Sequence, residues 1–148
     1  MWNENSEEGM VTDLLRDLDA PPVRDLLALT IGNPTPKGLE QLCTHYRTNP
    51  SYTLLGYQRN GVIIGCIGLQ LPSPGYAIIR AIAVAPSARG QGIGSHLLRQ
   101  SIGTFSLTHL SAETDLDAVE FYRKCGFTIS SLGEKYPGVE RYLCSWTL

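Results

Sequence analysis

The middle of this 148-residue sequence contains no acidic residue. Residues 41–112 hold neither aspartate nor glutamate, whereas residues 1–40 hold eight acidic and three basic residues, and residues 113–148 hold six and four. The middle block therefore carries a charge of +5, although the whole chain carries −2. Its five basic residues are Arg47, Arg59, Arg80, Arg89 and Arg99. A locally positive region suits a small polyanionic ligand, although buried strands that ordinarily lack acids account for part of the pattern.

Lysine is also scarce, since none lies between Lys37 and Lys124. Separated arginines without lysine clusters make a weak footprint for a polynucleotide, so no nucleic-acid partner is expected. The missing lysine also excludes a P-loop, which requires the pattern GxxxxGK[ST].

Long hydrophobic runs and paired cysteine motifs are absent as well. No apolar run approaches about 18 residues, so no membrane partner is expected. The segment from Met1 to Gly9 is polar and acidic, which indicates no secretory signal. The four cysteines form no CxxC pair and the three histidines are scattered, so we expect no metal site but free thiols in a cytoplasmic protein. With no repeat or linker, the length predicts a single domain over residues 1–148.

The most informative stretch runs from Ile78 to Leu98. The apolar, β-branched run from Ile78 to Val84 predicts a buried strand, and Pro86 should end it or make it splay from its neighbour. Alternate glycines follow, and apolar residues then recur at helical spacing at Ile93, Leu97, Leu98, Ile102 and Phe105. A strand, a glycine turn and a helix in this order predict an anion site, because the first N–H groups of a helix lack partners.

The glycine turn is also compatible with two alternatives to this anion site. A glycine-rich turn can bind nothing at all. A dinucleotide fingerprint needs GxGxxG, and Gly90, Gly92 and then Ser95 come close without matching. Glu113 lies near the distance at which that fingerprint wants an acidic residue, so this interpretation is weakened but not excluded.

Two stretches carry recognisable motifs. The first reads Val84-x-Pro86-x-x-Arg89-Gly90-Gln91-Gly92-Ile93-Gly94-x-x-Leu97-Leu98, and the second reads Ala118-x-x-Phe121-Tyr122-x-x-x-Gly126-Phe127. The first is similar to the acetyl-CoA signature, [QR]xxGxG, of the GNAT superfamily of N-acetyltransferases, and the second resembles a later motif of that family. The resemblance implies acetyl-CoA as cofactor, held by Ile82, Ala83, Val84, Arg89, Gly90, Gln91, Gly92, Ile93, Gly94, Ser95 and Tyr122.

The remaining helices and strands are predicted from turn- and cap-forming residues and from the spacing of apolar residues. We expect helices from Pro21 to Leu29 and from Pro36 to Arg47, a hairpin of strands 52–58 and 62–71 around Asn60-Gly61, a strand at 109–113 and a helix at 115–125. Closing strands are expected at 128–132 and 141–146, joined by a long charged turn; residues 10–18 can be strand or helix. The fold class is α+β, a GNAT-like mixed, mostly antiparallel sheet of six to seven strands covered by about four helices and splayed at the central strand.

The resemblance also implies a direct transfer, in which an amine attacks the thioester and coenzyme A leaves. A backbone N–H freed by splaying at Ala83 to Pro86, that of Val84, would hold the oxyanion. The resemblance makes Tyr122 the residue that protonates the departing thiolate, whereas spacing alone favours a core tyrosine. Many family members carry a glutamate on the central strand, whereas this chain has Arg80 there. Glu113 or an ordered water is therefore the expected base, although Glu113 is equally compatible with a solvated acid at the end of a strand.

The predicted function is acetyl transfer from acetyl-CoA to a primary amine of a small molecule or protein. The missing strand glutamate favours an alternative, a non-catalytic acyl-CoA-binding or regulatory module on the same fold. A nucleotide-binding protein that uses the glycine turn is a third possibility. We further expect a monomer or homodimer. The long turn between the closing strands can gate the acceptor site, with Glu134 or Glu140 attracting a cationic amine, or it can be an ordinary surface loop.

The helix near Asp115 starts among three cap-type residues, Thr114, Asp115 and Asp117. Asp117 and Glu120 have the spacing of a capping box, and Asp115 can serve as a cap only.

Overall fold

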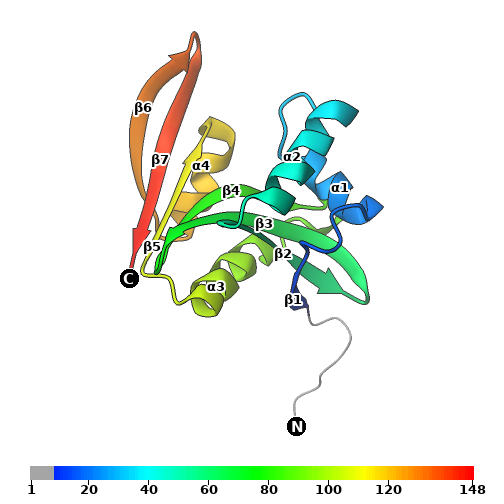
Figure 1. Cartoon of the computed structure of the whole chain (residues 1–148). Helices are drawn as coiled ribbons and strands as arrows, with labels where there is room; N and C mark the ends of the chain where they lie inside the picture. Colours follow the sequence, from blue (N-terminus) through cyan, green and yellow to red (C-terminus); the bar gives the residue numbers. More distant parts are fainter. Residues whose placement is uncertain (1–8) are drawn as a thin grey trace.

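The computed structural model describes residues 9–148 and folds them around one seven-stranded sheet of order β1-β2-β3-β4-β5-β7-β6. All neighbouring strands pair antiparallel except β4 and β5, which are parallel (Figure 1). The strands are β1 (Met10–Asp13), β2 (Tyr52–Arg59), β3 (Val62–Ser73), β4 (Tyr76–Val84), β5 (His109–Thr114), β6 (Thr128–Tyr136) and β7 (Val139–Thr147). The helices are α1 (Pro21–Ala28), α2 (Pro36–Thr48), α3 (Ile93–Phe105) and α4 (Leu116–Lys124), with a 3₁₀ turn η1 (Pro86–Ala88). The predicted α+β fold is confirmed.

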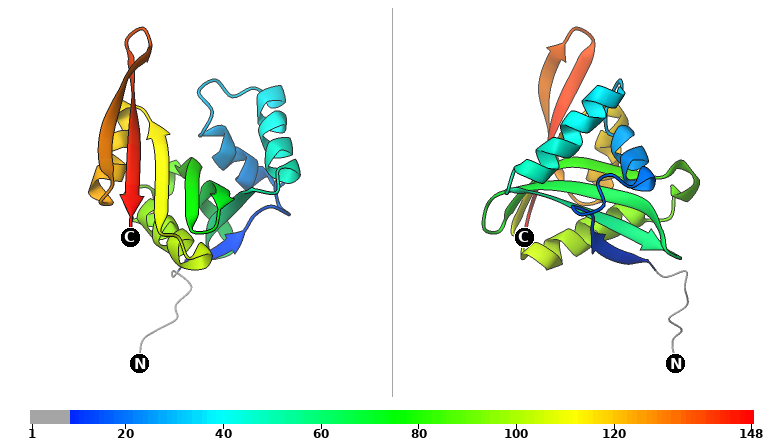
Figure 2. Two further views of the ribbon diagram at one scale, coloured as in Figure 1. Left: turned by 60° about the vertical axis from the view of Figure 1, so that its left-hand side comes forward. Right: turned by 45° about the vertical axis from the view of Figure 1, so that its right-hand side comes forward.

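Two hydrophobic cores cover the two faces of the sheet. The α1 and α2 helices lie on one face and bury Leu27 and Tyr46 there, whereas α3 and α4 bury Leu97 and Val119 in the other core. Figure 2 shows the α1–α2 pair and the β6–β7 hairpin on opposite sides of the central strands. This arrangement leaves the β4–β5 junction between two arms of the molecule.

Most predicted helices and strands form where the turn-forming residues of the sequence indicated. Asn60 and Gly61 both have positive φ, 54° and 77°, as a tight two-residue hairpin turn requires. The ambiguous segment 10–18 contains an edge strand, β1, which pairs with β2. The four cysteines are free, as expected. The expected absence of a secretory signal concerns a segment that lies, apart from Gly9, outside the described residues.

The prediction of a long turn between the closing strands is wrong. β6 continues to Tyr136 and β7 starts at Val139, so only Pro137 and Gly138 separate the two strands. The segment therefore forms a long hairpin rather than a gating loop (Figure 1). Eight of the nine β6 residues are exposed, so the strand shows no period-2 alternation of apolar and polar residues, and it depends on its backbone pairing with β7.

Candidate functional site

The central parallel pair of strands separates halfway along its length. β4 and β5 pair from Tyr76 opposite His109 to Ile79 opposite Ala112, and β4 then continues to Val84 without a partner on that side. The splay predicted at the central strand is present, but it starts at Arg80 rather than at Ala83. The β4 backbone from Arg80 to Val84 therefore lacks a β5 partner on this side.

The hydrogen-bond alternation of β4 directs two free amides into this gap. The Ala85 N–H donates to the Ile64 carbonyl of β3 at 2.8 Å. Because alternate residues of an antiparallel pair bond to the partner strand, Ile82 and Val84 direct their backbone groups away from β3. Arg89 Nε donates to the Val84 carbonyl at 3.0 Å, which fits this direction. The Val84 N–H predicted as the oxyanion donor thus faces the gap.

The glycine turn opens a hollow at the start of α3. Gly90 and Gly92 have φ values of 79° and 78°, a conformation that favours glycine, and α3 begins at Ile93. A cavity of about 350 Å³ lies against this turn. Seven of the predicted cofactor residues line it: Val84, Arg89, Gly90, Gly92, Ile93, Gly94 and Ser95. The predicted anion site and the start of the gap therefore meet at Val84.

The other predicted cofactor residues lie around the hollow without lining it. Gln91 accepts a hydrogen bond from Arg59 Nη1 at 2.6 Å, which ties the turn to β2. Ile82 packs on the core side with α3, and Ala83 packs on the α1–α2 side. Tyr122 contacts the main core rather than the hollow.

The contribution of α4 to this hollow was not predicted from the sequence. Phe121, Lys124 and Cys125 line it together with Ala88 of η1. Because Lys124 and Cys125 follow Phe121 by three and four residues, the sequence already indicated that the three side chains share one helix face. An adjoining cavity of about 390 Å³ shares Ser95, Lys124 and Cys125 and adds Arg99.

The two cavities form a cationic surface. None of Arg89, Arg99 and Lys124 forms an ion pair with a carboxylate within residues 9–148. The N-terminus of α3, with its free N–H groups, lies beside these charges. The arrangement can hold a phosphate-rich ligand.

Tyr122 lies on the buried side of α4, where it is 4% exposed. Its ring packs edge-on against Phe121 and Phe127, with centroids 5.1 and 5.3 Å away. Burial raises the pKa of the phenol well above its usual range. Among the described residues, Arg59 Nε is the only fully buried polar side-chain atom that lacks a hydrogen-bond partner. The Tyr122 hydroxyl makes no hydrogen bond to these residues either, so it is not fully buried and keeps contact with solvent.

Glu113 lies at the end of β5 and is already paired with two cations. Its Oε1 lies 3.5 Å from Arg141 Nε and 3.7 Å from Lys135 Nζ. Its side chain is 45% exposed. The structure therefore leaves Glu113 accessible but engaged, and its role as a base stays a prediction.

The start of α4 uses Asp115, one of the three cap-type residues that the sequence offers. Asp115 is the N-cap residue and accepts a hydrogen bond from the Ala118 N–H at 3.2 Å, whereas Asp117 lies in the first turn. At the other end, Gly126 has a φ of 91° and Phe127 donates its N–H to the Tyr122 carbonyl at 3.0 Å, which closes the helix in a Schellman motif. This closure fixes Tyr122 in the last turns.

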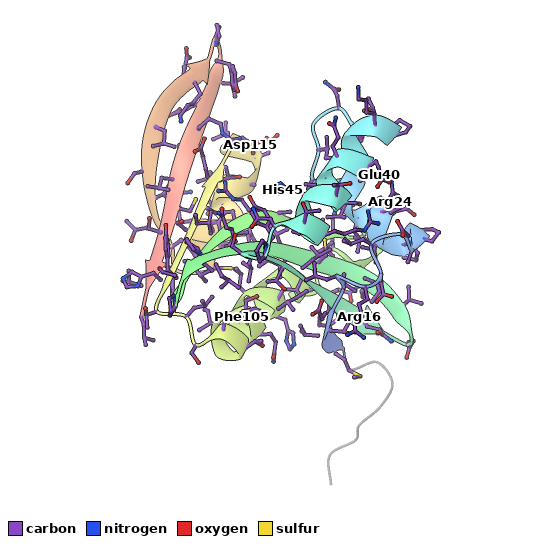
Figure 3. The ribbon with its side chains drawn as sticks, in the orientation of Figure 1. Arg16, Arg24, Glu40, His45, Phe105 and Asp115 are labelled. Carbon is purple, nitrogen blue, oxygen red and sulfur yellow. The ribbon has the colours of Figure 1, made fainter. Side chains whose placement is uncertain are left out.

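Four acidic residues lie together near the start of α4. Asp115, Asp117, Glu134 and Glu140 line a cavity of about 350 Å³ between α4 and the β6–β7 hairpin. Figure 3 shows Asp115 on the α4 side and His45 on the α2 side. The attraction of a cationic amine by Glu134 or Glu140 stays a prediction.

Residues 9–148 contain no helix that is long and apolar enough to cross a membrane. The same part of the chain brings together no three histidine, cysteine, aspartate or glutamate side chains that could hold a metal ion.

Comparisons with known proteins show which family and which solved structures this chain resembles. The model of the acetyltransferase (GNAT) family matches residues 20–127. No curated protein matches the chain.

Solved structures share the whole fold at low identity. A GNAT family acetyltransferase from Elizabethkingia anophelis, solved with acetyl-CoA bound, is 24% identical, with a TM-score of 0.69 over 95% of this chain and 98% of its own. An aminoglycoside 6'-N-acetyltransferase complexed with coenzyme A is 17% identical, with a TM-score of 0.75 over 93% and 96%. The ribosomal-protein-S18-alanine N-acetyltransferase from Escherichia coli is 19% identical, with a TM-score of 0.72 over 95% and 94%.

Proposed function

This chain belongs to the GNAT family of acetyltransferases, and we propose that it moves an acetyl group from acetyl-CoA to a primary amine of a small molecule or protein. The proposal rests on one observation: the glycine turn and the gap between β4 and β5 adjoin each other at Val84. The glycine turn and the start of α3 supply a cationic phosphate site, and the parted strands supply a slot with free amides.

Acetyl-CoA has the chemistry that this surface requires. Its diphosphate is suited to the N–H groups of Gly92, Ile93 and Gly94, and its 3′-phosphate to the cations Arg99 and Lys124. The extended arm then runs into the gap between β4 and β5. Two solved neighbours that hold acetyl-CoA or coenzyme A on the same fold support this choice.

The reaction proceeds by direct attack on the thioester. The amine nitrogen forms a bond to the carbonyl carbon, and the oxyanion is stabilised by the Val84 N–H. Collapse of the tetrahedral intermediate breaks the carbon–sulfur bond and releases coenzyme A. The Tyr122 phenol is protonated near neutral pH, as an ordinary tyrosine is, and burial raises its pKa further. It donates its proton to the departing sulfur.

The acceptor nitrogen must lose a proton before or during attack. For an α-amine with a pKa near 8 this costs about 1.4 kcal/mol at pH 7, whereas for a lysine side chain it costs about 4.6 kcal/mol. Glu113, or a water molecule that reaches the gap, accepts this proton.

The proposal is tested by mixing the protein with acetyl-CoA and amines and measuring thiol release and the mass of the product. We expect free thiol only when an amine is present, together with an N-acetylated product. If acetyl-CoA binds but no amine is acetylated, the protein is instead a non-catalytic acyl-CoA-binding module. The engagement of Glu113 by Arg141 and Lys135 is the observation that favours this second candidate.

A further inference from the structure

Arg80 lies at the point where the two central strands separate. On β3, Gly68 and Leu69 are neighbours, but they face Ala81 and Ile79 of β4, so Arg80 is the extra residue of a β-bulge. A bulge redirects a side chain and ends regular pairing. Arg80 is also the first β4 residue without a partner on β5. Its exposed side chain therefore starts at the inner end of the gap.

The partner of Arg80 shows which face of the sheet it occupies. Arg80 Nε and Nη2 donate to Gln70 Oε1 at 3.0 and 2.6 Å. Ile67 and Leu69 of β3 point into the α3 core and Cys66 into the α1–α2 core, so Gln70 lies on the α1–α2 face by alternation. This face is opposite to α3, whose N-terminus forms the phosphate site.

The charge of Arg80 is not compensated within the described part of the chain. Gln70 is neutral, and no carboxylate of residues 9–148 forms an ion pair with Arg80. Gln70 occupies only one side of the guanidinium, since Nη1 makes no hydrogen bond to any described residue. The end of the guanidinium is thus free to accept a planar, bidentate partner.

The nearest acid on the neighbouring strand does not cancel this charge. Leu110 and Ala112 of β5 point into the α3 core, so Glu113 lies on the same face as Arg80. Glu113 is paired with both Arg141 and Lys135. Glu113 is therefore engaged by other cations and does not compensate the charge of Arg80.

We propose that Arg80 selects acceptors whose reacting amine is accompanied by a carboxylate on the same small molecule, and that Gln70 positions its guanidinium for this contact. The inference rests on the proposed acetyl transfer and names its acceptor class. The carboxylate supplies the charge that Arg80 lacks, and the planar guanidinium matches its two oxygens. The observation that carries the proposal is the uncompensated charge of Arg80, whose guanidinium is held by Gln70 on one side only, at the inner end of the gap.

The test is a panel of amino acids, each paired with the primary amide of the same carbon skeleton, with acetylation followed by thiol release. We expect the wild-type protein to prefer the acid over its amide at least tenfold in kcat/KM. Arg80→Gln should lower kcat/KM for the acids by about ten- to hundredfold, the loss typical of a charged hydrogen-bonded contact, and change it for the amides less than threefold. The KM for acetyl-CoA should stay constant.

Two further variants separate this role from general damage. Gln70→Glu keeps Arg80 but gives it a carboxylate, and should reduce the acid preference as Arg80→Gln does. Arg16→Gln is the matched control, since Arg16 forms no ion pair in the described residues and lies by β1, away from the gap (Figure 3).

Three outcomes overturn the inference. One is acetylation of other amines without any preference for carboxylates, which leaves the proposed function intact. Another is a rise in the KM for acetyl-CoA with equal losses for acids and amides in Arg80→Gln, which would assign Arg80 to the cofactor. The third is no acetylation of any amine, which removes the proposed transfer as well.

Discussion

Tyr122 combines burial with a hydroxyl group that has no partner within residues 9–148 and still reaches solvent. A phenol that serves only in packing would be replaced by phenylalanine without loss, because the ring contacts with Phe121 and Phe127 would remain. A phenol that donates to the leaving sulfur would not. The two roles therefore differ in kinetics rather than in stability.

We expect Tyr122→Phe to lower kcat at least tenfold, in keeping with the usual contribution of a proton donor. The KM for acetyl-CoA and the unfolding temperature should change little. Tyr136→Phe is the control, because Tyr136 is 67% exposed at the far end of β6. Undiminished turnover of Tyr122→Phe would reduce Tyr122 to a core residue.

Single residues were predictable where a motif or a backbone requirement specified them. Gly90, Gly92 and Gly126, which belong to the two motifs, all have positive φ. The bulge at Arg80 was not predictable, because it depends on the register between β3 and β4 rather than on the sequence of either strand. Among the cap-type residues Thr114, Asp115 and Asp117, the cap is Asp115, because β5 extends to Thr114 and helical backbone starts directly after Asp115.

Among the elements, α2 is attached to the sheet by a close contact between Tyr46 and β3. Tyr46 is 2% exposed, and a Cβ at Gly68 would lie 1.9 Å from its hydroxyl oxygen, so only glycine leaves room for the phenol. Burial is the main cause that raises the pKa of Tyr46 above its usual value of about 10. This contact makes the docking of α2 sensitive to alkaline pH.

The sign of that sensitivity follows from proton linkage. Above pH 10 the unfolded chain loses the Tyr46 proton while the folded chain keeps it, so stability is lost as the pH rises. Between pH 9 and pH 11 this tyrosine should account for about 1.4 kcal/mol of lost unfolding free energy. Urea unfolding of the wild type and of Tyr46→Phe at both pH values measures it. Equal losses in the two proteins would refute the assignment.

Elements were predictable where their ends carry strong signals. Pro21 and Pro36 each lie in the first turn of a helix, and Asn60-Gly61 forms the hairpin turn. The length of the β6–β7 hairpin escaped prediction because β6 is exposed on nearly every residue and so lacks a hydrophobic period. The start of the splay escaped as well, since it is set by where β5, about thirty residues later in the chain, turns away from β4.

Across the whole molecule, the absence of acids between residues 41 and 112 has two structural counterparts. One is the cationic surface around the start of α3, and the other is the unpaired Arg80 on the opposite face of the sheet. The composition indicated a polyanionic ligand but not this division. We infer that the cationic residues around the start of α3 bind the phosphates of the donor, whereas Arg80 binds the acceptor.

Every step proposed for the reaction depends on the binding of acetyl-CoA to the glycine turn and the gap behind it. Thermal unfolding of the wild type, of Gly92→Glu and of Gly133→Glu in the presence of acetyl-CoA, CoA, NAD or ATP measures this binding. Gly133 on β6 is a matched control, because its φ of 78° equals that of Gly92 and a Cβ at either position meets no atom within 4 Å.

Acetyl-CoA at about a hundred times its Kd should stabilise the wild type by about 2.7 kcal/mol, a rise of roughly 5–10 °C in Tm. We expect this rise for the wild type and for Gly133→Glu, and its loss in Gly92→Glu. A rise with NAD or ATP but not with acetyl-CoA, or an undiminished rise in Gly92→Glu, would overturn the assignment of the cofactor site.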